Sequence, residues 1–168
     1  PVIEVIKCRV ESSDTAEDLF NTIQGIGCEA LASALQKIDS GNYTPLDQNH
    51  DVATPARKLK KEDGLIQWDK SSTEIYNAIR GFFPYPVCYS YLDGKMFRIR
   101  KAALATECDN AQRSGALYFD ATKSLFVKTG DGALQILELQ LEGKKAMAPL
   151  DFHNGLQTKE GLQLVSQF

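Results

Sequence analysis

The first forty residues combine a short apolar run with a long stretch of helical periodicity. Residues 2–10 are rich in Val and Ile, which predicts a strand. Asp14 and Glu17 lie three residues apart and predict a capping arrangement at the start of a helix. Gly41 predicts its end. The apolar stripe of this helix consists of Ala16, Leu19, Phe20, Ile23, Ala30, Leu31, Ala34, Leu35 and Ile38.

A polar segment without periodicity follows the helix. Residues 42–56 contain Pro45 and Pro55 and predict a linker. Beyond it, Ser71 and Glu74 form the sequence pattern of a capping box and predict a second, shorter helix. Its inner side is expected to carry Ile75, Ile79 and Phe82.

The pattern then changes to strands. Two Gly-containing segments, Asp93-Gly94 and Gly130-Asp131-Gly132, predict hairpin turns between them. In the last strand, Leu134 and Ile136 share one face, whereas Leu137, Leu139 and Leu141 share the other. This change of phase predicts a β-bulge or a strand that passes between two packing environments. Short strands with a bulge favour a small, partly open barrel. Five strands are predicted, over residues 87–91, 96–102, 115–119, 124–129 and 133–141.

Composition indicates a folded protein without a membrane span or a zinc site. The chain of 168 residues is 43% hydrophobic and 24% charged, and no apolar run approaches the roughly 18 residues that a span requires. Its cysteines form no CxxC pair, so we expect buried, reduced thiols of a cytosolic protein. They are Cys8, Cys28, Cys88 and Cys108.

Charge is distributed unevenly. Residues 1–56 carry three Lys or Arg against nine Asp or Glu, whereas residues 57–168 carry sixteen against thirteen. Such asymmetry indicates a nucleic-acid or other anionic partner for the basic half, and ordinary surface variation is the alternative.

Basic residues form three clusters that could follow a phosphate backbone. One comes just after the linker, one alternates with Phe97 and Ile99 in a predicted strand, and one follows the last long strand. Phosphate contacts position RNA without reading its sequence. For each cluster alone, a solvated, solubilising face is the favoured interpretation. The candidate RNA-binding set is Arg57, Lys58, Lys60, Lys61, Arg80, Arg98, Arg100, Lys144 and Lys145.

The sequence offers no catalytic, cofactor-binding or metal-ligating constellation. His50 and His153 have no Cys or Ser at a suggestive spacing, and the carboxylates form no evident acid–base pair. Aromatic residues around the Phe-Phe-Pro-Tyr-Pro run could stack on bases, although packing in a barrel corner is the favoured interpretation. They are Phe82, Phe83, Tyr85, Tyr89 and Tyr91.

Three segments together resemble the C-terminal domain of methionyl-tRNA formyltransferases. They are residues 58–68, with Lys58-Leu59-Lys60-Lys61, residues 79–86, with Phe-Phe-Pro-Tyr-Pro, and residues 137–147, with Gly143-Lys144-Lys145. Residues 1–38 look like the end of that family's catalytic domain. The chain departs from the family at Pro55, where a tyrosine is usual, and at Tyr85, where the family has Trp between two prolines.

The resemblance implies a mainly β fold, an OB-like barrel preceded by a strand–helix remnant of a Rossmann-like α/β domain. It divides the chain into 1–41, the remnant, 42–60, the linker, and 61–168, the barrel domain. The family's catalytic Asn, His and Asp lie in its N-terminal domain, upstream of the part that residues 1–38 resemble, and no residue of this chain matches them. The chain alone is therefore expected to be inactive.

The implied parent transfers a formyl group from 10-formyltetrahydrofolate to initiator methionyl-tRNA, in the cytoplasm or an organellar matrix, as a monomer without membrane attachment. No cofactor is expected on this chain; its partners are tRNA and the catalytic domain. Two alternatives stay open. The parent could be a related formyltransferase or formyl-folate hydrolase acting on another substrate, or the chain could be a free-standing RNA-binding module.

Overall fold

The chain folds as two units, which we describe separately. The structure is a computed structural model, and it describes residues 1–105 and 113–166. The first unit comprises Pro1–Lys58 and the second Leu59–Phe168. Over the described residues, no helix is both long enough and apolar enough to cross a membrane.

The cap of the long helix α1 (Ala16–Asp39) lies one residue later than predicted. Its N-cap is Thr15, whose side chain accepts from the Asp18 amide at 3.2 Å, while the Asp18 carboxylate accepts from the Thr15 amide at 2.9 Å. Asp14 is not the cap because its carboxylate accepts from the Glu11 amide, in the preceding turn. Gly41 has a φ of +66° just after the helix, as its prediction as a helix stop requires.

The strand predicted over residues 2–10 is wrong. In this segment only Val2 pairs, in an isolated bridge in which its amide and carbonyl bond to Leu46 at 2.7 and 2.9 Å. A strand persists only with hydrogen-bonded neighbours, and β-propensity alone does not supply them. Residues 3–10 are therefore extended without forming a sheet.

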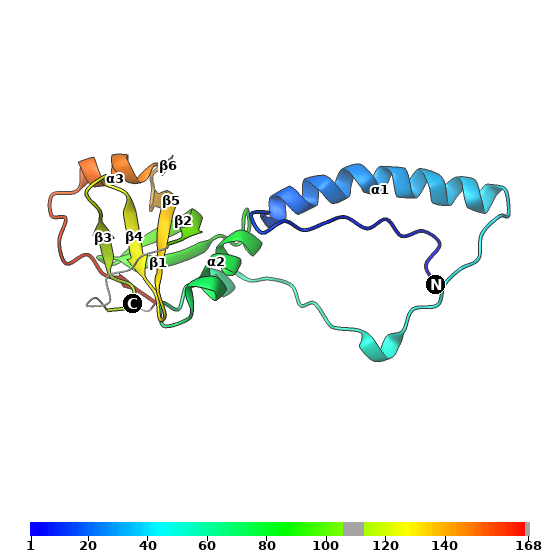
Figure 1. The fold of residues 1–168 in the computed structure, drawn as a ribbon, viewed down its shortest axis with the longest axis horizontal. Coiled ribbons are helices and arrows are strands. Elements are labelled where there is room, and N and C mark those ends of the chain that lie inside the picture. The colour runs from blue at the N-terminus through cyan, green and yellow to red at the C-terminus, as the bar shows by residue number, and fades with distance from the viewer. Residues whose placement is uncertain (106–112, 167–168) are drawn as a thin grey trace. The chain divides into compact units, whose positions relative to one another are not determined.

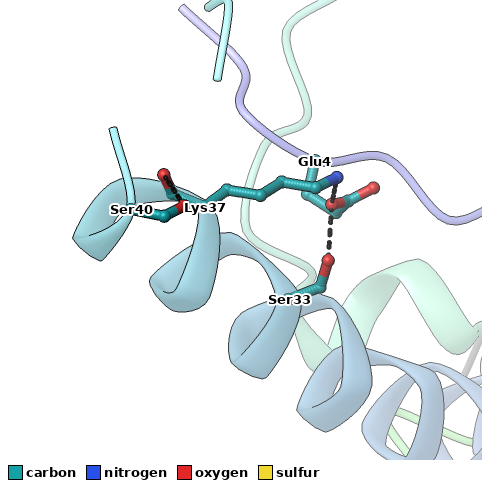
Figure 2. Close-up of polar contacts among 4 residues, drawn as sticks. All are labelled: Glu4, Ser33, Lys37 and Ser40. Carbon is teal, nitrogen blue, oxygen red and sulfur yellow. Dashed lines mark hydrogen bonds and ion pairs between the residues drawn. The ribbon is translucent and has the colours of Figure 1, made fainter. Parts of the chain in front are cut away.

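Glu4 ties this extended segment to α1. Its carboxylate accepts from the Ser33 hydroxyl at 2.9 Å and pairs with the Lys37 ammonium (Figure 2). Lys37, and then Ser33, hold the pKa of Glu4 below its ordinary value because both favour the carboxylate. The apolar stripe of α1, in contrast, is uncovered: the helix has no buried residue, and Phe20 and Leu31 are 67% and 61% exposed. The predicted linker is irregular except for the 3₁₀ helix η1 (His50–Val52).

The second unit begins with two helices. The 3₁₀ helix η2 (Lys61–Gly64) leads to α2 (Ser72–Gly81). The predicted capping box is confirmed: the Ser71 hydroxyl accepts from the Glu74 amide, and the Glu74 carboxylate accepts from the Ser71 amide, both at 3.2 Å. Ile75 and Ile79 are buried, and Phe82 packs against the same core.

All five predicted strands are confirmed, and they form an antiparallel sheet in the order β3-β4-β5-β2-β1, to which β7 adds beside β1. Two further strands, β6 beside β5 and β7 beside β1, have two residues each and leave no periodic pattern in the sequence. The short helix α3 (Pro149–Gly155) lies between them in the chain. The strand bounds are β1 (Cys88–Leu92), β2 (Lys95–Leu104), β3 (Leu117–Phe119), β4 (Leu125–Lys128), β5 (Ala133–Leu141), β6 (Ala146–Met147) and β7 (Leu164–Val165).

Residues 162–165 join the two edges of this sheet. On one side, β7 pairs with β1, and the Ser90 hydroxyl donates to the Val165 carbonyl at 2.8 Å. On the other side, the Leu117 amide donates to the Leu162 carbonyl at 2.9 Å, and Gln163 bridges Ala116. The sheet therefore curls into a small barrel, which confirms the predicted fold class. We call the junction of β3 with residues 162–164 the seam.

The predicted bulge is confirmed between β2 and β5. The pairs are Ile99 with Leu139, Lys101 with Glu138 and Ala102 with Ile136, so each strand carries one extra residue there. On β5 that residue is Leu137, which is 45% exposed. The slip brings both Ile136 and Leu139 into the core, although their spacing is odd.

The core fills the barrel and continues under both helices. Phe97 on β2 is fully buried, and its ring meets that of Phe152 on α3 at 5.5 Å between centroids. Figure 1 shows α3 over the end of the strands away from α2, which contributes Ile75 and Ile79. Together the helices exclude water from the two ends of the barrel.

A polar network fastens the β4–β5 turn to α2. The Asp131 carboxylate accepts from the Ser72 amide at 2.7 Å and from its hydroxyl at 3.0 Å, and Ser72 also bonds to buried Thr129 at 2.7 Å. Gly130 is required because a Cβ there would collide with the Asp69 carbonyl. The predicted turn is confirmed, as is the Asp93-Gly94 turn, whose two residues have φ of 47° and 77°.

We expect the second unit to retain amide protection that the first unit lacks. Within the described residues, every buried residue belongs to the second unit, and protection follows burial of hydrogen-bonded backbone. Hydrogen exchange should therefore be much faster over 1–38 than over the strands. Equal amide protection in the two units would contradict this expectation. Repeating the measurement at several protein concentrations would show whether self-association through the α1 stripe protects the first unit.

Replacing Asp131 by Asn should destabilise the protein more at neutral pH than in acid. The Ser72 amide first, and then its hydroxyl and Thr129, hold the pKa of Asp131 below its ordinary value of 3.8. Its stabilisation is therefore complete above that value and is lost as the pH falls through the lowered pKa. Urea unfolding at pH 6 and near pH 3 should show a difference between Asp131→Asn and the parent that shrinks in acid. Asp93→Asn is the control, because Asn tolerates positive φ in that turn; an equal loss at both pH values would refute the ionic contribution.

Candidate nucleic-acid interface

The strand register places Arg98 in the middle of a row of outward-facing side chains. Arg98 on β2 pairs with Tyr89 on β1 and with Gln140 on β5. Cross-strand partners share a face, and the neighbouring row, Phe97 with Ser90, is buried. We call Tyr89, Arg98 and Gln140 the Arg98 row. All three are half-buried, so the row is part of the outer wall of the barrel.

One end of this row meets the basic segment after the linker. Tyr89 forms a parallel bridge with Leu65, and the Ile66 amide donates to the Tyr89 carbonyl at 2.9 Å. Leu65 directly follows η2, which begins with Lys61 after its N-cap Lys60. Both lysines are exposed.

The other end of the row meets the turn with the paired lysines. Gln140 pairs with Ala146 on β6, and its side-chain amide donates to the Lys144 carbonyl at 2.8 Å. Lys144 and Lys145 are exposed. Four inter-strand steps separate Leu65 from Ala146, a path of about 19 Å along the wall of the barrel at about 4.8 Å a step. Members of three basic clusters that are distant in sequence therefore lie along one band of the barrel wall. The residues of this band are Lys60, Lys61, Arg98, Lys144 and Lys145.

Two predicted arginines already have partners within the protein. Arg100 donates from Nε to the Glu138 carboxylate at 3.1 Å, and its guanidinium lies 5.0 Å from the centre of the Phe83 ring. Arg80 donates to the Asn77 side chain at 2.9 Å and lies over the ring of Tyr76. Their role in RNA binding stays a prediction, but an RNA phosphate would compete with these contacts.

Arg57 and Lys58 belong to the first unit and are exposed. In the chain, Leu59 alone separates them from Lys60 and Lys61, near the start of the second unit. The four cations were predicted as one cluster, and the boundary between the units divides it into two pairs.

The band is not uniformly basic. Glu62 lies in η2 beside the lysines, and the Glu142 carboxylate accepts from the Met96 amide at 3.1 Å. Burial first, and then Tyr91 and Glu62, raise the pKa of Tyr89, because each disfavours a phenolate. Tyr89 therefore presents a neutral hydroxyl and an aromatic ring at neutral pH.

No pattern in the sequence singles out Gln140. Its role follows from the register with Arg98, which depends on strands about forty residues apart. Of the aromatic residues considered for stacking, Phe83 is buried, as expected of a corner residue, whereas Tyr85 is 55% exposed.

The histidines and cysteines form no reactive cluster in the described part of the chain. His50 is exposed in η1, and the His153 ring contacts the edge of Phe119 at 4.8 Å between centroids. Among the described residues, no three His, Cys, Asp or Glu side chains are grouped as a metal site would require.

The expectation of buried thiols is correct for Cys88 and wrong for two others. Burial raises the pKa of Cys88 to about 12, which keeps it a neutral thiol. Cys8 and Cys28 are exposed because the extended segment and α1 have no buried residues. Cys108 lies outside the described residues.

Comparison with known proteins places this geometry in a family context. Residues 58–157 match the model of the formyl transferase C-terminal domain. The chain is 35% identical over 151 residues to the methionyl-tRNA formyltransferase of Geobacter metallireducens, covering 90% of this chain and 48% of that protein. It is 33% identical over 166 residues to that of Thermodesulfovibrio yellowstonii, covering 99% and 52%. The chain thus spans about half the length of these relatives.

Solved structures show the same fold at lower identity. HypX from Aquifex aeolicus aligns over 84% of this chain and 26% of its own length, with a TM-score of 0.64 and 16% identity. Another HypX structure, in complex with tetrahydrofolic acid, aligns with a TM-score of 0.57, at 17% identity over 74% of this chain and 22% of that one. The sugar 3N-formyl transferase WlaRD aligns over 79% and 46%, with a TM-score of 0.51 and 24% identity.

Proposed function

The chain belongs to the formyl transferase C-terminal domain family, and on that premise we propose that it is the tRNA-binding portion of a methionyl-tRNA formyltransferase. The parent would transfer the formyl group of 10-formyltetrahydrofolate to the α-amine of initiator methionyl-tRNA. The parent would be a monomer that acts in translation initiation, in the cytoplasm or in an organellar matrix.

The convergence of three basic clusters on the Arg98 row carries this proposal. Lys60 and Lys61 precede one end of a path that runs about 19 Å along the barrel wall from Leu65 to Ala146, and Lys144 and Lys145 lie in the turn at its other end. A span of this size accommodates several phosphates of an RNA backbone. Exposed lysines bind phosphates as point charges, which suits a surface that holds RNA without reading bases.

The chain's contribution to catalysis would be orientation. Holding the acceptor arm of the tRNA places the amine within reach of the formyl donor and replaces a bimolecular encounter with a positioned one. Proton transfer and stabilisation of the oxyanion would depend on the family's Asn, His and Asp, for which no match was found in this sequence. The folate is a co-substrate of the parent, and no residue of this chain is assigned to it.

A related formyltransferase acting on another amine is the second candidate. WlaRD, a sugar 3N-formyl transferase, shares the fold. That likeness supports the architecture alone, whereas relatives at 33–35% identity over most of the chain are methionyl-tRNA formyltransferases. Binding of tRNA against binding of a nucleotide-linked sugar would separate the two.

Replacing Lys58, Lys61, Lys144 and Lys145 by Ala should weaken tRNA binding and reduce its salt dependence. Each phosphate contact contributes about 0.7 to 0.9 to the slope of log affinity against log salt, so the slope should flatten by up to about four such contributions. Preference for initiator tRNA should change little, because phosphate contacts carry no direct sequence information. Titrations at several salt concentrations measure both effects.

The charge-matched control replaces four cations outside the band by Ala. All four residues of the control, Lys7, Arg9, Lys70 and Lys101, are exposed; the first three lie outside the strands, and Lys101 lies on β2 beyond the bulge from Arg98. The control variant loses as much positive charge as the quadruple lysine variant. It should therefore weaken the long-range attraction of tRNA but keep most of the slope of log affinity against log salt. Equal effects of both quadruple variants would show that net charge alone acts and that the band is a solvated face.

The chain alone should not formylate methionyl-tRNA. We expect no turnover with 10-formyltetrahydrofolate above a control without protein, since no residue here matches the family's catalytic Asn and His. Clear turnover would overturn this expectation and direct the search for a base to His50, His153 and the carboxylates.

A further inference from the structure

The turn between β5 and β6 carries the paired lysines of the band and has little backbone pairing of its own. β6 pairs with β5 over two residues. The turn is closed by a bond from the Lys144 amide to the Leu141 carbonyl at 3.1 Å. Gly143, the third residue of this four-residue turn, has a φ of +70°, which favours glycine. We call residues 141–145 the lysine turn.

Two side chains fasten the lysine turn to neighbouring strands. The Gln140 side-chain amide donates to the Lys144 carbonyl at 2.8 Å. Because a carbonyl only accepts, this bond also fixes which end of the Gln140 amide faces the turn. The Glu142 amide donates to the Met96 carbonyl at 3.0 Å, and the Glu142 carboxylate accepts from the Met96 amide at 3.1 Å. The turn is therefore held to β5 by Gln140 and to β2 by Glu142.

These bonds fix the backbone of Lys144 but not its side chain. The Lys144 amide bonds to Leu141 and its carbonyl to Gln140, so both of its backbone polar groups have partners within the protein. The side chains of Lys144 and Lys145 are exposed. Two free ammonium groups thus extend from a backbone whose position is set by the strands beside it.

Gln140 is also the direct neighbour of the central cation of the band. It pairs with Arg98 on β2, and cross-strand partners have Cβ atoms about 4.5 to 5.5 Å apart. One residue therefore lies beside Arg98 and bonds to the backbone of Lys144. The strand register and a single side-chain hydrogen bond together set how far the lysine turn lies from Arg98.

We propose that Gln140 is a positioning residue for phosphate binding, which holds Lys144 and Lys145 at a fixed distance from Arg98 before RNA arrives. The proposal rests on the proposed RNA-binding function and adds that this part of the band is organised in the free protein. Ordering a loop on binding weakens affinity, and a loop that is already ordered avoids that loss. A hydrogen bond between neutral groups corresponds to about a 2- to 10-fold change in affinity.

The test measures tRNA binding by the full 168-residue chain and its variants. Gln140→Met keeps a similar length and the same net charge but removes the donor, so it should weaken binding by about 2- to 10-fold. In a chain that carries Lys144→Ala and Lys145→Ala, it should cause no further loss, because no ammonium group is left to position. In a chain with Lys60→Ala and Lys61→Ala, it should keep its full effect.

Two further variants separate positioning from a general effect on the fold. Gln135→Met is the matched control: Gln135 lies on β5 and is half-buried, and within the described residues its side chain forms no hydrogen bond, so this variant should bind as the parent does. Gln140→Asn keeps an amide that is one methylene too short, so it should lose as much affinity as Gln140→Met. Urea unfolding identifies a variant that misfolds, and Gln140→Asn carries the test if Gln140→Met does so.

Hydrogen exchange of the free proteins reports on the turn without RNA. The Lys144 amide should exchange faster in Gln140→Met than in the parent and in Gln135→Met, because the bond that steadies the turn is lost. Unchanged exchange would overturn the positioning role.

The binding outcomes distinguish this role from the proposed function. If Gln140→Met and Gln140→Asn bind tRNA as the parent does, or lose the same affinity in both lysine backgrounds, the positioning role is wrong. Binding that still depends on the lysines would then leave the proposed function standing. If the parent binds no tRNA, the proposed function fails, and a role of Gln140 in RNA binding fails with it even where exchange shows that it holds the turn.

Discussion

An antiparallel sheet of five strands in series, β3-β4-β5-β2-β1, has two open edges, and in this protein one segment of four residues joins them. Residues 162–165 bond to β1 on one side and to β3 on the other, through backbone hydrogen bonds and the Ser90 hydroxyl. Closure leaves Phe97, Ile99 and Leu139 without solvent contact and turns the alternate residues outward. It also makes the outer wall continuous, so that rows of side chains can cross several strands without meeting an open edge.

The bulge between β2 and β5 then divides that wall. On one side of it lies the Arg98 row, and on the other lie the residues that follow the Tyr118–Phe126 pair onto β5. Arg100 stands at the division, where it is the extra residue of β2 and pairs with Glu138. The two rows present different chemistry on neighbouring parts of one sheet. The Arg98 row carries charged and amide groups, whereas Tyr118 and Phe126 carry stacked rings.

Local patterns predicted those features that local physics decides. Alternation in β2 placed Phe97 and Ile99 inside, since successive side chains on a strand point to opposite faces. The spacing of Ser71 and Glu74 located the start of α2 because both partners of the cap lie within one turn. Residues 2–10 show the limit of such reasoning: they have the composition of a strand, but pairing depends on a neighbour that composition does not specify. The two-residue strand β7 is the converse case, because its place beside β1 comes from a partner far away in the chain, Tyr91 for Val165. β6 pairs with β5 across a short turn, but two residues are too few to form a periodic pattern.

Sequence patterns also do not show which of the candidate cations already have a partner within the protein and which are left to bind a phosphate. Alternation predicted that Arg98 and Arg100 share the outer face, but the partner of Arg100 comes from thirty-eight residues later in the chain, and the Phe83 ring packs over it. A guanidinium that is fixed by a carboxylate and an aromatic ring is already organised, and moving it to a phosphate would leave Glu138, which is about 29% exposed, without that partner. The lysines at the two ends of the Arg98 row are exposed, and a flexible ammonium reaches a phosphate without disturbing the fold. In this barrel the arginines with intramolecular partners therefore stabilise the wall, and the lysines are the residues that a phosphate backbone would meet first.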